Sequence, residues 1–469
     1  MTTNQTTNQT TSPESESKEA RAKQGFIVEK FSRWIRYCHW LNVPFISIMI
    51  WSGLLIYWAN PQYLPMPDWL AQALFLDHRL AEGMGWHFAI MWLFSINGIV
   101  YVSYLLLSGE WREIVPLKRS FGDALDVVRH DLKLRKELPP QPGKINGAQR
   151  FAYTGALALG FVVLITGIAI YKPVQVQWLT ESLGGYPAAR LEHFLCMVLL
   201  VGFIFIHLLQ VFRAGWKNLC GMITGIEEPA PRRLRKSLVT GALFFVLAVG
   251  IFIFIRFGPQ KDHLPVALRD VQKLNEKVGR KLVSNPGHAP FKAAPLKGKA
   301  PRVNGLIGLR DDVDSETYRL HVESGTKTLV LKIEDIEALP RTEATTDFKC
   351  VEGWTEVFQY AGVRFSDFMK AEGVGLHDDG SPYPYVGMET PDKTYFVSMD
   401  IKSMMSPDTV LAFEMNGDEL AIENGYPLRL MIPSKYGIKN LKRVGRIFFS
   451  DTRPPDYWQK RGYDWFAGL

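Results

Sequence analysis

Cysteine is scarce in this sequence, and its few copies are not paired. The 469 residues include four, Cys38, Cys196, Cys220 and Cys350, and none forms a CxxC pair. This pattern excludes a disulfide framework and the common cysteine-rich zinc sites. The first 24 residues also lack an apolar stretch, so they do not predict a signal peptide. We expect residues 1–24 to form a disordered cytoplasmic tail.

Long apolar runs, by contrast, are abundant. Apolar residues make up 47% of the chain, with 13 Trp and 28 Phe, yet 22% of residues are charged. This mixture predicts a membrane part joined to a soluble part. A bilayer crossing needs about 20 apolar residues. Five stretches qualify: Leu41–Trp58, Met84–Leu107, Phe151–Tyr171, Leu191–Phe212 and Val239–Phe257.

Lysine and arginine are unevenly distributed among the connections between these spans. Residues 18–36, 108–150 and 213–237 hold six, nine and six, whereas residues 59–82 and 172–190 hold one and two. The positive-inside rule then predicts a cytoplasmic N-terminus and a periplasmic C-terminal domain in a bacterial inner membrane. The net charge of +7 therefore reflects membrane topology and predicts no nucleic-acid partner.

Four of the ten histidines, His39, His87, His193 and His207, lie in or at the spans. Ionisable groups there are usually functional, although any one of them could instead bond to a neighbouring helix. His193 and His207 are 14 residues apart, about 21 Å along a helix and nearly on one face. The span directions pair His39 with His207 and His87 with His193 by depth. Paired imidazoles at two depths of a bundle predict two bis-histidine b haems.

The expected membrane domain, residues 25–225, also resembles a known family from about Val28 to Thr224. "RYCHWLNVPFISIMIWSGLLIY", "GWHFAIMW" and "LEHFLCMVLLVGFIFIHLLQVFRAGW" are similar to the di-haem cytochrome b subunits of formate dehydrogenase, nickel-iron hydrogenase and thiosulfate reductase. The resemblance implies an all-α bundle of four helices that holds two haems b and exchanges electrons with a membrane quinone. Residues 226–258 would add a fifth, anchoring span.

The composition changes after residue 258. Residues 259–300 are rich in Pro, Lys and Gly and predict a linker. From residue 301 to 469, short runs such as "TYRLHV", "TLVLKI", "TVLAFEM", "LRLMI" and "RIFFS" predict a mixed α+β domain rich in strands. Tyr383, Tyr385 and Tyr395 are candidates for a substrate pocket or for strand core. We find no convincing internal repeat.

Cys350 stands alone in this C-terminal domain. By itself it fits an apolar filler, a reactive thiol or a soft metal ligand. Downstream, "ENGYPLRLMIPSKYGIKNLKRVGRI" combines glycines with groups that bind phosphate, or forms a basic surface loop. The candidate anion ligands are Asn424, Arg429, Lys435, Lys439, Lys442 and Arg443.

Residues 302–469 resemble the sulfite-oxidase-like molybdopterin family. "KCVEGW", "NGYPLRLMIPSKYGIKNLKRVGRI" and "RPPDYW" occur in the family's order and spacing. The resemblance implies one molybdenum on a single pyranopterin, with Cys350 as the catalytic protein thiolate on the metal. It also implies cofactor contacts from Asn304, Thr390, Asn424, Arg429, Lys439, Asn440, Leu441 and Lys442.

"CVEGW" is closer to the periplasmic protein-methionine-sulfoxide reductase catalytic subunit than to sulfite oxidases, whose cysteine precedes a polar, Arg-containing stretch. The chain departs from that reductase group in its fused membrane cytochrome of another type. We expect a molybdenum oxidoreductase that links a small periplasmic substrate to the quinone pool through two b haems, with reduction of sulfoxide- or N-oxide-like groups favoured. The alternatives are a sulfite or related dehydrogenase, and a di-haem cytochrome with a non-catalytic docking domain.

Two arginines precede the fifth span. Arg232 and Arg233 stand before a moderately apolar stretch, a layout that resembles a twin-arginine signal and equally fits an ordinary positive-inside flank. The sequence leaves the export route, the oligomeric state and the substrate open.

Overall fold

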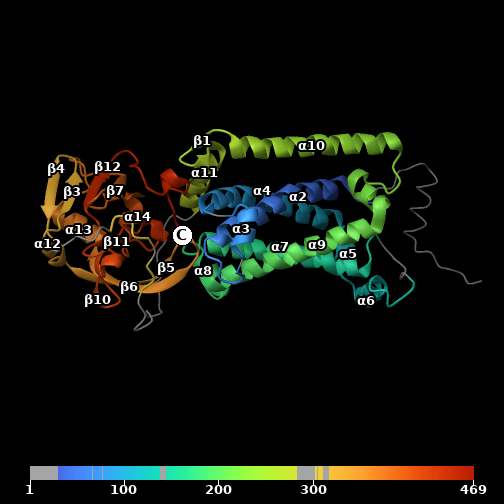
Figure 1. The fold of residues 1–469 in the computed structure, drawn as a ribbon, viewed down its shortest axis with the longest axis horizontal. Helices are drawn as coiled ribbons and strands as arrows, with labels where there is room; N and C mark the ends of the chain where they lie inside the picture. The colour runs from blue at the N-terminus through green and yellow to red at the C-terminus, as the bar shows by residue number, and fades with distance from the viewer. Residues whose placement is uncertain are drawn as a thin grey trace, which may run out of the picture. The chain divides into compact units, whose positions relative to one another are not determined.

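The computed structural model describes residues 30–65, 67–76, 78–137, 144–282, 301–303, 305–309 and 316–469 (Figure 1). Asn304 and the expected tail at residues 1–24 lie outside the described residues.

Five of the described helices are long and apolar enough to cross a membrane. They are α2 (Arg33–Trp58), α4 (Leu80–Ser108), α7 (Gly147–Tyr171), α9 (Tyr186–Thr224) and α10 (Pro231–Phe257). Each contains one of the five apolar stretches expected from the sequence, so the helical N-terminal region is confirmed. Short helices lie in the connections: α3 (Asp68–Ala73), α5 (Trp111–Ile114), α6 (Ser120–Asp131) and α8 (Gln177–Ser182).

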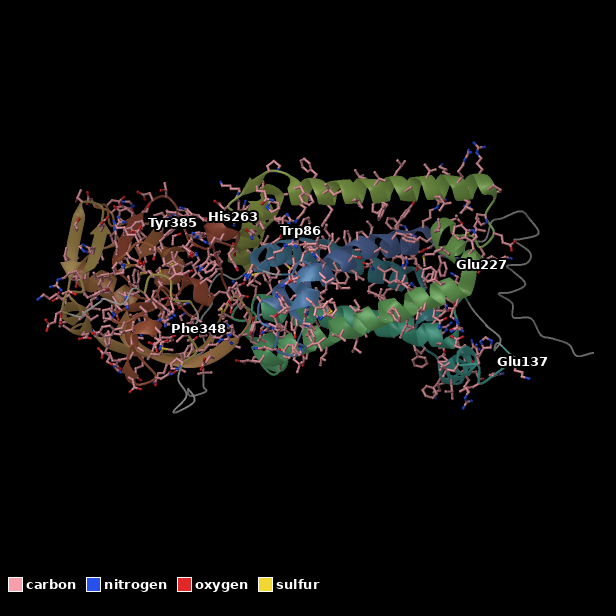
Figure 2. All side chains as sticks on the ribbon, viewed as in Figure 1. Trp86, Glu137, Glu227, His263, Phe348 and Tyr385 are labelled. Atoms are coloured by element: carbon pink, nitrogen blue, oxygen red, sulfur yellow. The ribbon has the colours of Figure 1, made fainter. Side chains whose placement is uncertain are left out.

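The long helices have apolar side chains on their surfaces. Along α10, Leu243, Phe245 and Phe254 are each about two thirds exposed or more, at 66%, 67% and 72%. Figure 2 shows side chains projecting along the whole length of this helix. A helix that is apolar all round is stable only where its surroundings are apolar, as in a bilayer. In α9, regular helix is interrupted at Gly215, whose φ of 77° favours glycine.

The C-terminal domain contains two five-stranded sheets. The first has the order β10-β9-β6-β5, with β11 also paired to β9, and the second has the order β4-β3-β12-β7-β8. Only the β12–β3 pair is parallel among the described strands. The first sheet contains β5 (Arg341–Lys349), β6 (Thr355–Arg364), β9 (Val410–Met415), β10 (Asp418–Glu419) and β11 (Arg429–Met431). The second contains β3 (Leu320–Ser324), β4 (Lys327–Leu331), β7 (Tyr385–Glu389), β8 (Phe396–Asp400) and β12 (Arg446–Ser450).

Apolar side chains from both sheets form the main core. Leu320 of β3, Val363 of β6 and Ile447 of β12 are fully buried in it. Short helices complete the domain: α12 (Ile333–Glu337), α13 (Phe365–Glu372), α14 (Ile401–Met404), and the 3₁₀ turns η1 (Ile422–Asn424), η2 (Gly437–Lys439) and η3 (Gln459–Arg461). The expected mixed α+β domain is thereby confirmed.

The first part of the expected linker is folded. A hairpin of β1 (Gln260–Lys261) and β2 (Leu264–Pro265) leads into α11 (Val266–Leu282). This helix is amphipathic: Leu268, Arg269 and Asn275 are buried on one face. The spacing of these residues is helical, but two of them are polar, so composition alone pointed to a linker. Residues 283–300 lie outside the described residues.

The chain divides into two compact units. The first comprises Met1–Ser47, Trp92–Val163 and Leu195–Ile253, and the second Ile48–Met91, Leu164–Phe194 and Phe254–Leu469. The second unit therefore includes the C-terminal domain together with one end of each long helix. His39 and His207 belong to the first unit, whereas His87 and His193 belong to the second.

Candidate functional site

His87 on α4 and His193 on α9 face each other. Their ring centroids are 6.4 Å apart, with an angle of 69° between the planes. Each ring also meets a fully buried hydroxyl: Ser52 Oγ lies 3.1 Å from His87 Nδ1, and Thr166 Oγ1 lies 3.0 Å from His193 Nδ1. Both contacts are made by Nδ1, so Nε2 is the candidate nitrogen for a metal.

His39 on α2 and His207 on α9 form the other pair expected from the sequence. Their ring centroids are 6.1 Å apart. Aromatic rings surround them: Phe203 stacks on His207 at 5.8 Å, and Trp40 lies edge-on to His39 at 5.4 Å. The structure therefore brings the four histidines together in the two pairs that span direction predicts.

The spacing of both pairs fits an iron between them. Two imidazole–metal bonds of about 2.0 Å each, with the ring radius added on each side, span roughly 6 Å. The observed separations of 6.1 and 6.4 Å match this span. Buried neutral imidazoles that face each other without a shared hydrogen bond are suitable axial ligands for haem. The residues of both pairs thus fit a b haem.

Cys350 lies in the tight loop between β5 and β6 and is 3% exposed. Its backbone N–H donates to the Trp354 carbonyl, and its carbonyl accepts from the Gly353 N–H, both at 2.9 Å. Gly353 has a φ of 90°, which a residue with a side chain would adopt only under strain. The sequence "CVEGW" therefore folds the loop back on itself and fixes the thiol in a buried position.

Tyrosines gather around this thiol. Burial raises the pKa of Tyr395, Tyr436 and Tyr463 above the ordinary value, and the negative charge of an ionised Cys350 contributes to each shift. Their hydroxyls therefore remain protonated at neutral pH. The Tyr395 hydroxyl already donates to the Ile438 carbonyl at 2.7 Å, which leaves Tyr436 and Tyr463 as candidate donors near the thiol. Tyr186, at the start of α9, also interacts electrostatically with Cys350. Of these four, we singled out only Tyr395 from the sequence, and no periodic pattern marks the others.

Arg190 connects the Cys350 loop to a histidine-bearing helix. It lies on α9, three residues before His193, and its guanidinium donates to the carbonyl of Gly353, three residues after Cys350. Both ends of this contact belong to the second compact unit. Arg190 carried no motif in the sequence, because a side chain that binds a distant backbone carbonyl leaves no local pattern.

A second cluster, the cation cluster, contains Arg429, Lys442 and Asn424. Arg429 donates to the Asn424 carbonyl at 2.8 Å, and Lys442 donates to the Gly305 carbonyl at 3.0 Å. Burial, followed by the positive charge of Arg429, lowers the pKa of Lys442 to about 8. The cluster therefore concentrates positive charge that an anion would stabilise.

Two buried polar atoms, one in the cation cluster and one in a neighbouring residue, have no hydrogen-bond partner among the described residues. They are Arg429 Nε and the hydroxyl of Tyr360, and the Arg429 guanidinium lies 5.3 Å from the Tyr360 ring centre. Buried polar atoms are rarely left unpaired unless a ligand or water meets them. An unpaired guanidinium N–H on Arg429, with the ammonium of Lys442 close by, fits the oxygens of a phosphate, so these two residues suit the phosphate end of a pterin cofactor.

The remaining expected cofactor residues make other contacts. Lys439 is paired with Asp456 at 2.5 Å, and each side chain is 1% exposed. The Asn440 amide accepts from the Ile432 N–H at 2.7 Å, and Leu441 is buried in the main core. Thr390 donates to Asp392 at 2.6 Å. These four stay predictions as cofactor contacts, and their visible contacts hold the fold.

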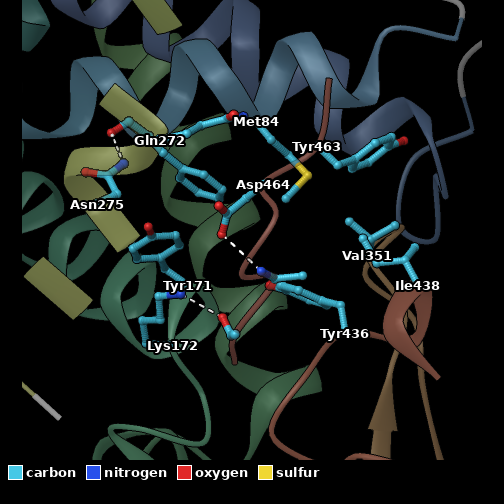
Figure 3. Close-up of a pocket in the computed structure, with 13 residues that line it drawn as sticks. Met84, Tyr171, Lys172, Gln272, Asn275, Val351, Tyr436, Ile438, Tyr463 and Asp464 are labelled. Atoms are coloured by element: carbon cyan, nitrogen blue, oxygen red, sulfur yellow. Dashed lines mark hydrogen bonds between the residues drawn. The ribbon is translucent and has the colours of Figure 1, made fainter. Parts of the chain in front are cut away.

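A cavity lies beside the Cys350 loop (Figure 3). Val351, Tyr436 and Tyr463 line one part of it, and Phe88 and Tyr171, from the helices α4 and α7, line another. Lys172 also lines the cavity and donates to the Gly468 carbonyl at 2.6 Å. Burial lowers the pKa of Lys172, opposed by the charges of Asp464 and Glu276. The cavity therefore extends from the residue after Cys350 to the residue after His87.

Comparison with known proteins agrees with both halves of this arrangement. Residues 30–225 match the model of the prokaryotic cytochrome b561 family, and residues 307–458 match the oxidoreductase molybdopterin binding domain. A protein of Azospira oryzae named "Putative protein-methionine-sulfoxide reductase subunit YedZ1" is 35% identical over 195 residues, which are 41% of this chain and 94% of that protein. The chain belongs to the prokaryotic cytochrome b561 family. In this cytochrome b561 a molybdopterin-binding oxidoreductase domain is joined to the membrane part, and both resemblances expected from the sequence are confirmed.

Other relatives share less with the cytochrome b561 chain. Mitochondrial sulfite oxidase of Rattus norvegicus is 27% identical over 181 residues, and the match covers 33% of each protein. The structure of the sulfane dehydrogenase SoxCD from Paracoccus pantotrophus is 26% identical, with a TM-score of 0.27 and coverage of 30% of this chain and 40% of that one. Together with the five apolar helices, the comparisons identify a bacterial membrane oxidoreductase that uses haem b and molybdopterin.

Proposed function

We propose that this enzyme exchanges electrons between a small periplasmic substrate, bound at a molybdenum–pterin site, and the membrane quinone pool through two b haems. The contact between Arg190 and Gly353 carries the proposal. It links the loop of the proposed molybdenum ligand, Cys350, to the helix of a proposed haem ligand, His193. A direct contact between the segments that carry two proposed redox sites supports electron exchange between them.

Each group has a defined set of candidate residues. Cys350 would bind molybdenum as a thiolate, and Asn424, Arg429 and Lys442 would bind the pterin phosphate. The histidine pairs would each hold one haem iron. When bound, molybdenum supplies two-electron chemistry and the haems carry electrons one at a time. The hydroxyls of Tyr436 and Tyr463 would orient a polar substrate, because their raised pKa values keep them protonated.

We favour reduction of sulfoxide- or N-oxide-like groups. Val351 follows the cysteine in place of the Arg-containing stretch that would hold sulfite. The cavity beside it is lined by aromatic side chains and also by the polar residues Lys172, Gln272, Asn275 and Asp464. The name of the Azospira oryzae relative, a putative protein-methionine-sulfoxide reductase subunit, also supports reduction. A cytochrome of this type is therefore less of a departure from the reductase group than expected from the sequence. The sulfite oxidase similarity favours a second candidate, a sulfite or related dehydrogenase that feeds quinone.

The periplasmic location of the molybdopterin domain rests on charge alone. The segments on one side of the spans, residues 18–36, 108–150 and 213–237, are rich in Lys and Arg, whereas residues 59–82 and 172–190 on the other side are not. Labelling of a cysteine introduced at exposed Lys402, in intact cells with a reagent that does not cross the inner membrane, tests this location.

Metal content with matched variants tests the function. The full chain is purified in detergent from cells that make the molybdenum cofactor, as wild type, Cys350→Ala and Cys220→Ala. Cys220 is a buried cysteine of α9 and serves as the control. We expect about one molybdenum and two haems per chain in wild type and control, and loss or spectroscopic change of molybdenum alone in Cys350→Ala. Wild type without molybdenum would contradict the proposal.

The direction of the reaction is tested with the same samples. Haems reduced by a quinol should become oxidised on addition of methionine sulfoxide or an N-oxide, and Cys350→Ala should not respond. Reduction of oxidised haems by sulfite, with no response to sulfoxides or N-oxides, would select the dehydrogenase instead.

A further inference from the structure

A short sequence repeat surrounds the His87–His193 pair. α2 carries "SGLLIY" at residues 52–57, and α7 carries "TGIAIY" at residues 166–171. Each begins with a hydroxyl residue and glycine and ends in Ile-Tyr. The repeat is too short to be convincing in the sequence alone, which is why we expected none. In the structure, the two copies make equivalent contacts.

Each copy of the motif contacts both of the helices that carry the histidines, α4 and α9. Ser52 of α2 meets His87, and Tyr57 of the same helix stacks on Phe194 at 4.7 Å. Conversely, Thr166 of α7 meets His193, and Tyr171 of the same helix packs on Phe88 at 4.3 Å. Phenylalanine follows histidine in both cases. The four helices thus surround the pair with local two-fold pseudosymmetry.

The hydroxyl contacts have a defined direction on the Ser52 side. Ser52 Oγ donates its own proton to the Ile48 carbonyl at 2.6 Å, so it meets His87 Nδ1 as an acceptor, and the Met49 backbone carbonyl is a second acceptor for the same ring. The imidazole must then carry its proton on Nδ1, and Nε2 keeps its lone pair. The equivalent 3.0 Å contact of Thr166 with His193 is consistent with the same arrangement. An acceptor on the distal N–H of a metal-bound histidine fixes the ring and raises its basicity.

The glycines of the repeat leave room beside the rings. A Cβ at Gly167 would lie 3.3 Å from His193 Cε1, closer than ordinary contact, and a Cβ at Gly53 would lie 3.6 Å from His87 Cε1. The hydroxyl residue therefore fixes each ring, and the following glycine lets the ring sit close to the helix backbone.

We propose that Ser52 and Thr166 are matched positioning residues, each of which holds one imidazole in its Nδ1-protonated form and thereby lowers the reduction potential of the haem bound between His87 and His193. This inference rests on the haem ligation in the proposed function. A more basic ligand stabilises ferric iron, so removal of either hydroxyl makes this haem easier to reduce.

The test compares side chains of equal shape with and without the hydroxyl. Ser52→Thr and Ser52→Val differ only in that group, as do wild-type Thr166 and Thr166→Val. The controls are Ser47→Ala, an exposed serine of α2 whose hydroxyl donates to the Val43 carbonyl at 2.8 Å, and Thr154→Val of α7, whose hydroxyl donates to the Ile114 carbonyl at 3.1 Å. The readouts are haem per chain and the midpoint potential of each haem, from optical redox titration of the purified protein.

We expect each Val variant to raise the midpoint potential of one haem, with an increase of about tenfold in its equilibrium constant for reduction, or 59 mV for one electron. Ser52→Thr, Ser47→Ala and Thr154→Val should retain the wild-type value. Loss of this haem in Ser52→Val with retention in Ser52→Thr would also support the inference. Equal behaviour of Ser52→Val and Ser52→Thr, or unchanged potentials in both Val variants, would overturn it.

His193→Ala separates this inference from the proposed function. If that variant has the same haem content as wild type, the pair holds no haem and the proposed ligation fails. If that variant loses one haem, and Ser52→Val and Thr166→Val change neither the haem content nor the midpoint potentials, only the role of Ser52 and Thr166 fails.

Discussion

The second compact unit contains two candidate redox sites that are built in different ways. The His87–His193 pair lies on regular helices, and its neighbours Ser52 and Thr166 come from two copies of one short motif. Cys350 lies in an irregular loop, and the tyrosines around it come from α9, from the residue before β8 and from the C-terminal segments. The helical site is neutral and its pattern is local, whereas the thiol site depends on segments far apart in sequence. The two sites should therefore respond independently to mutation.

The largest expected effect tests this independence. We expect His193→Ala to reduce haem from about two to about one per chain, because one axial ligand is lost, and to abolish quinone-linked turnover. Molybdenum content and turnover with a soluble viologen dye should remain, because Cys350 and the cation cluster are unchanged. Metal analysis, a haem assay and the two activities provide the measurements. Loss of molybdenum together with the haem would mean that cofactor binding at the Cys350 site depends on haem binding at the His87–His193 pair.

The next effect concerns the stability of the molybdopterin domain alone. Lys439 and Asp456 form a buried ion pair, and Lys439 also donates to the Ser398 carbonyl at 3.0 Å. Lys439→Met leaves the Asp456 carboxylate buried without its cation, which costs about 3–5 kcal/mol. Thermal unfolding should show a lower midpoint for this domain with the haem spectrum unchanged. Adding Asp456→Asn should recover part of the loss, and no recovery would contradict the ion-pair explanation.

A smaller effect is expected where the two sites meet. Arg190→Met removes the charged hydrogen bond to the Gly353 carbonyl, worth about 1.5–3 kcal/mol. We expect both cofactors to be retained and the electron exchange between substrate and haem to slow by about tenfold, measured by stopped-flow absorbance. Arg213→Met serves as the control, because exposed Arg213 lies on the same helix and pairs with Asp131 at 3.3 Å. Equal rates in the two variants would remove Arg190 from the electron path.

The smallest effect is a pH dependence in the cation cluster. Lys442 has a pKa of about 8, below its ordinary value near 10.4. Its proton is therefore lost as pH rises through about 8, and affinity for an anionic pterin phosphate should fall above that pH. Molybdenum retained after dialysis at pH 7 and pH 9.5 measures this, and Lys442→Gln should show less dependence on pH.

The lowered pKa of Lys442 also affects the stability of the cofactor-free chain. Here the expected change with pH is an increase, whereas the affinity for the cofactor decreases. The unfolded chain binds more protons than the folded one between about pH 8 and 10, so the free energy of unfolding should rise with pH across that interval. Denaturant unfolding of protein from cells that lack the cofactor measures it. A flat profile would contradict the burial of the Lys442 ammonium.

Local patterns account for what the sequence could predict. Apolar length gave the five spans, charge asymmetry paired the histidines by depth, and the runs from "TYRLHV" to "RIFFS" correspond to β3, β4, β9, β11 and β12. The structure adds β5 and β6, which flank the Cys350 loop. Their sequences are mixed in polarity because β5 is exposed in part, so simple alternation did not mark them.

The unpredicted parts of the site depend on tertiary contacts. Tyr186, Tyr436 and Tyr463 lie near Cys350 because distant segments fold together, and Arg190 reaches Gly353 across 163 positions of sequence. The two copies of the motif at Ser52 and Thr166 can be found in the sequence. Their role could be inferred only from the contacts of these hydroxyls with His87 and His193 in the structure. The roles of Thr390, Lys439, Asn440 and Leu441 toward the cofactor stay predictions.

The contact between Arg190 and the Cys350 loop is made to a main-chain carbonyl rather than to a side chain. Val351 lies between the cysteine and that carbonyl and can therefore be replaced without removing the contact, whereas the Glu352 carboxylate accepts from Trp354 Nε1 at 3.1 Å within the same loop. Substitutions beside the sulfur could then change which substrates bind there, while the hydrogen bond between Arg190 and the Gly353 carbonyl is retained. Such separation makes the loop a suitable place for directed evolution of new substrate ranges in a membrane-wired oxidoreductase.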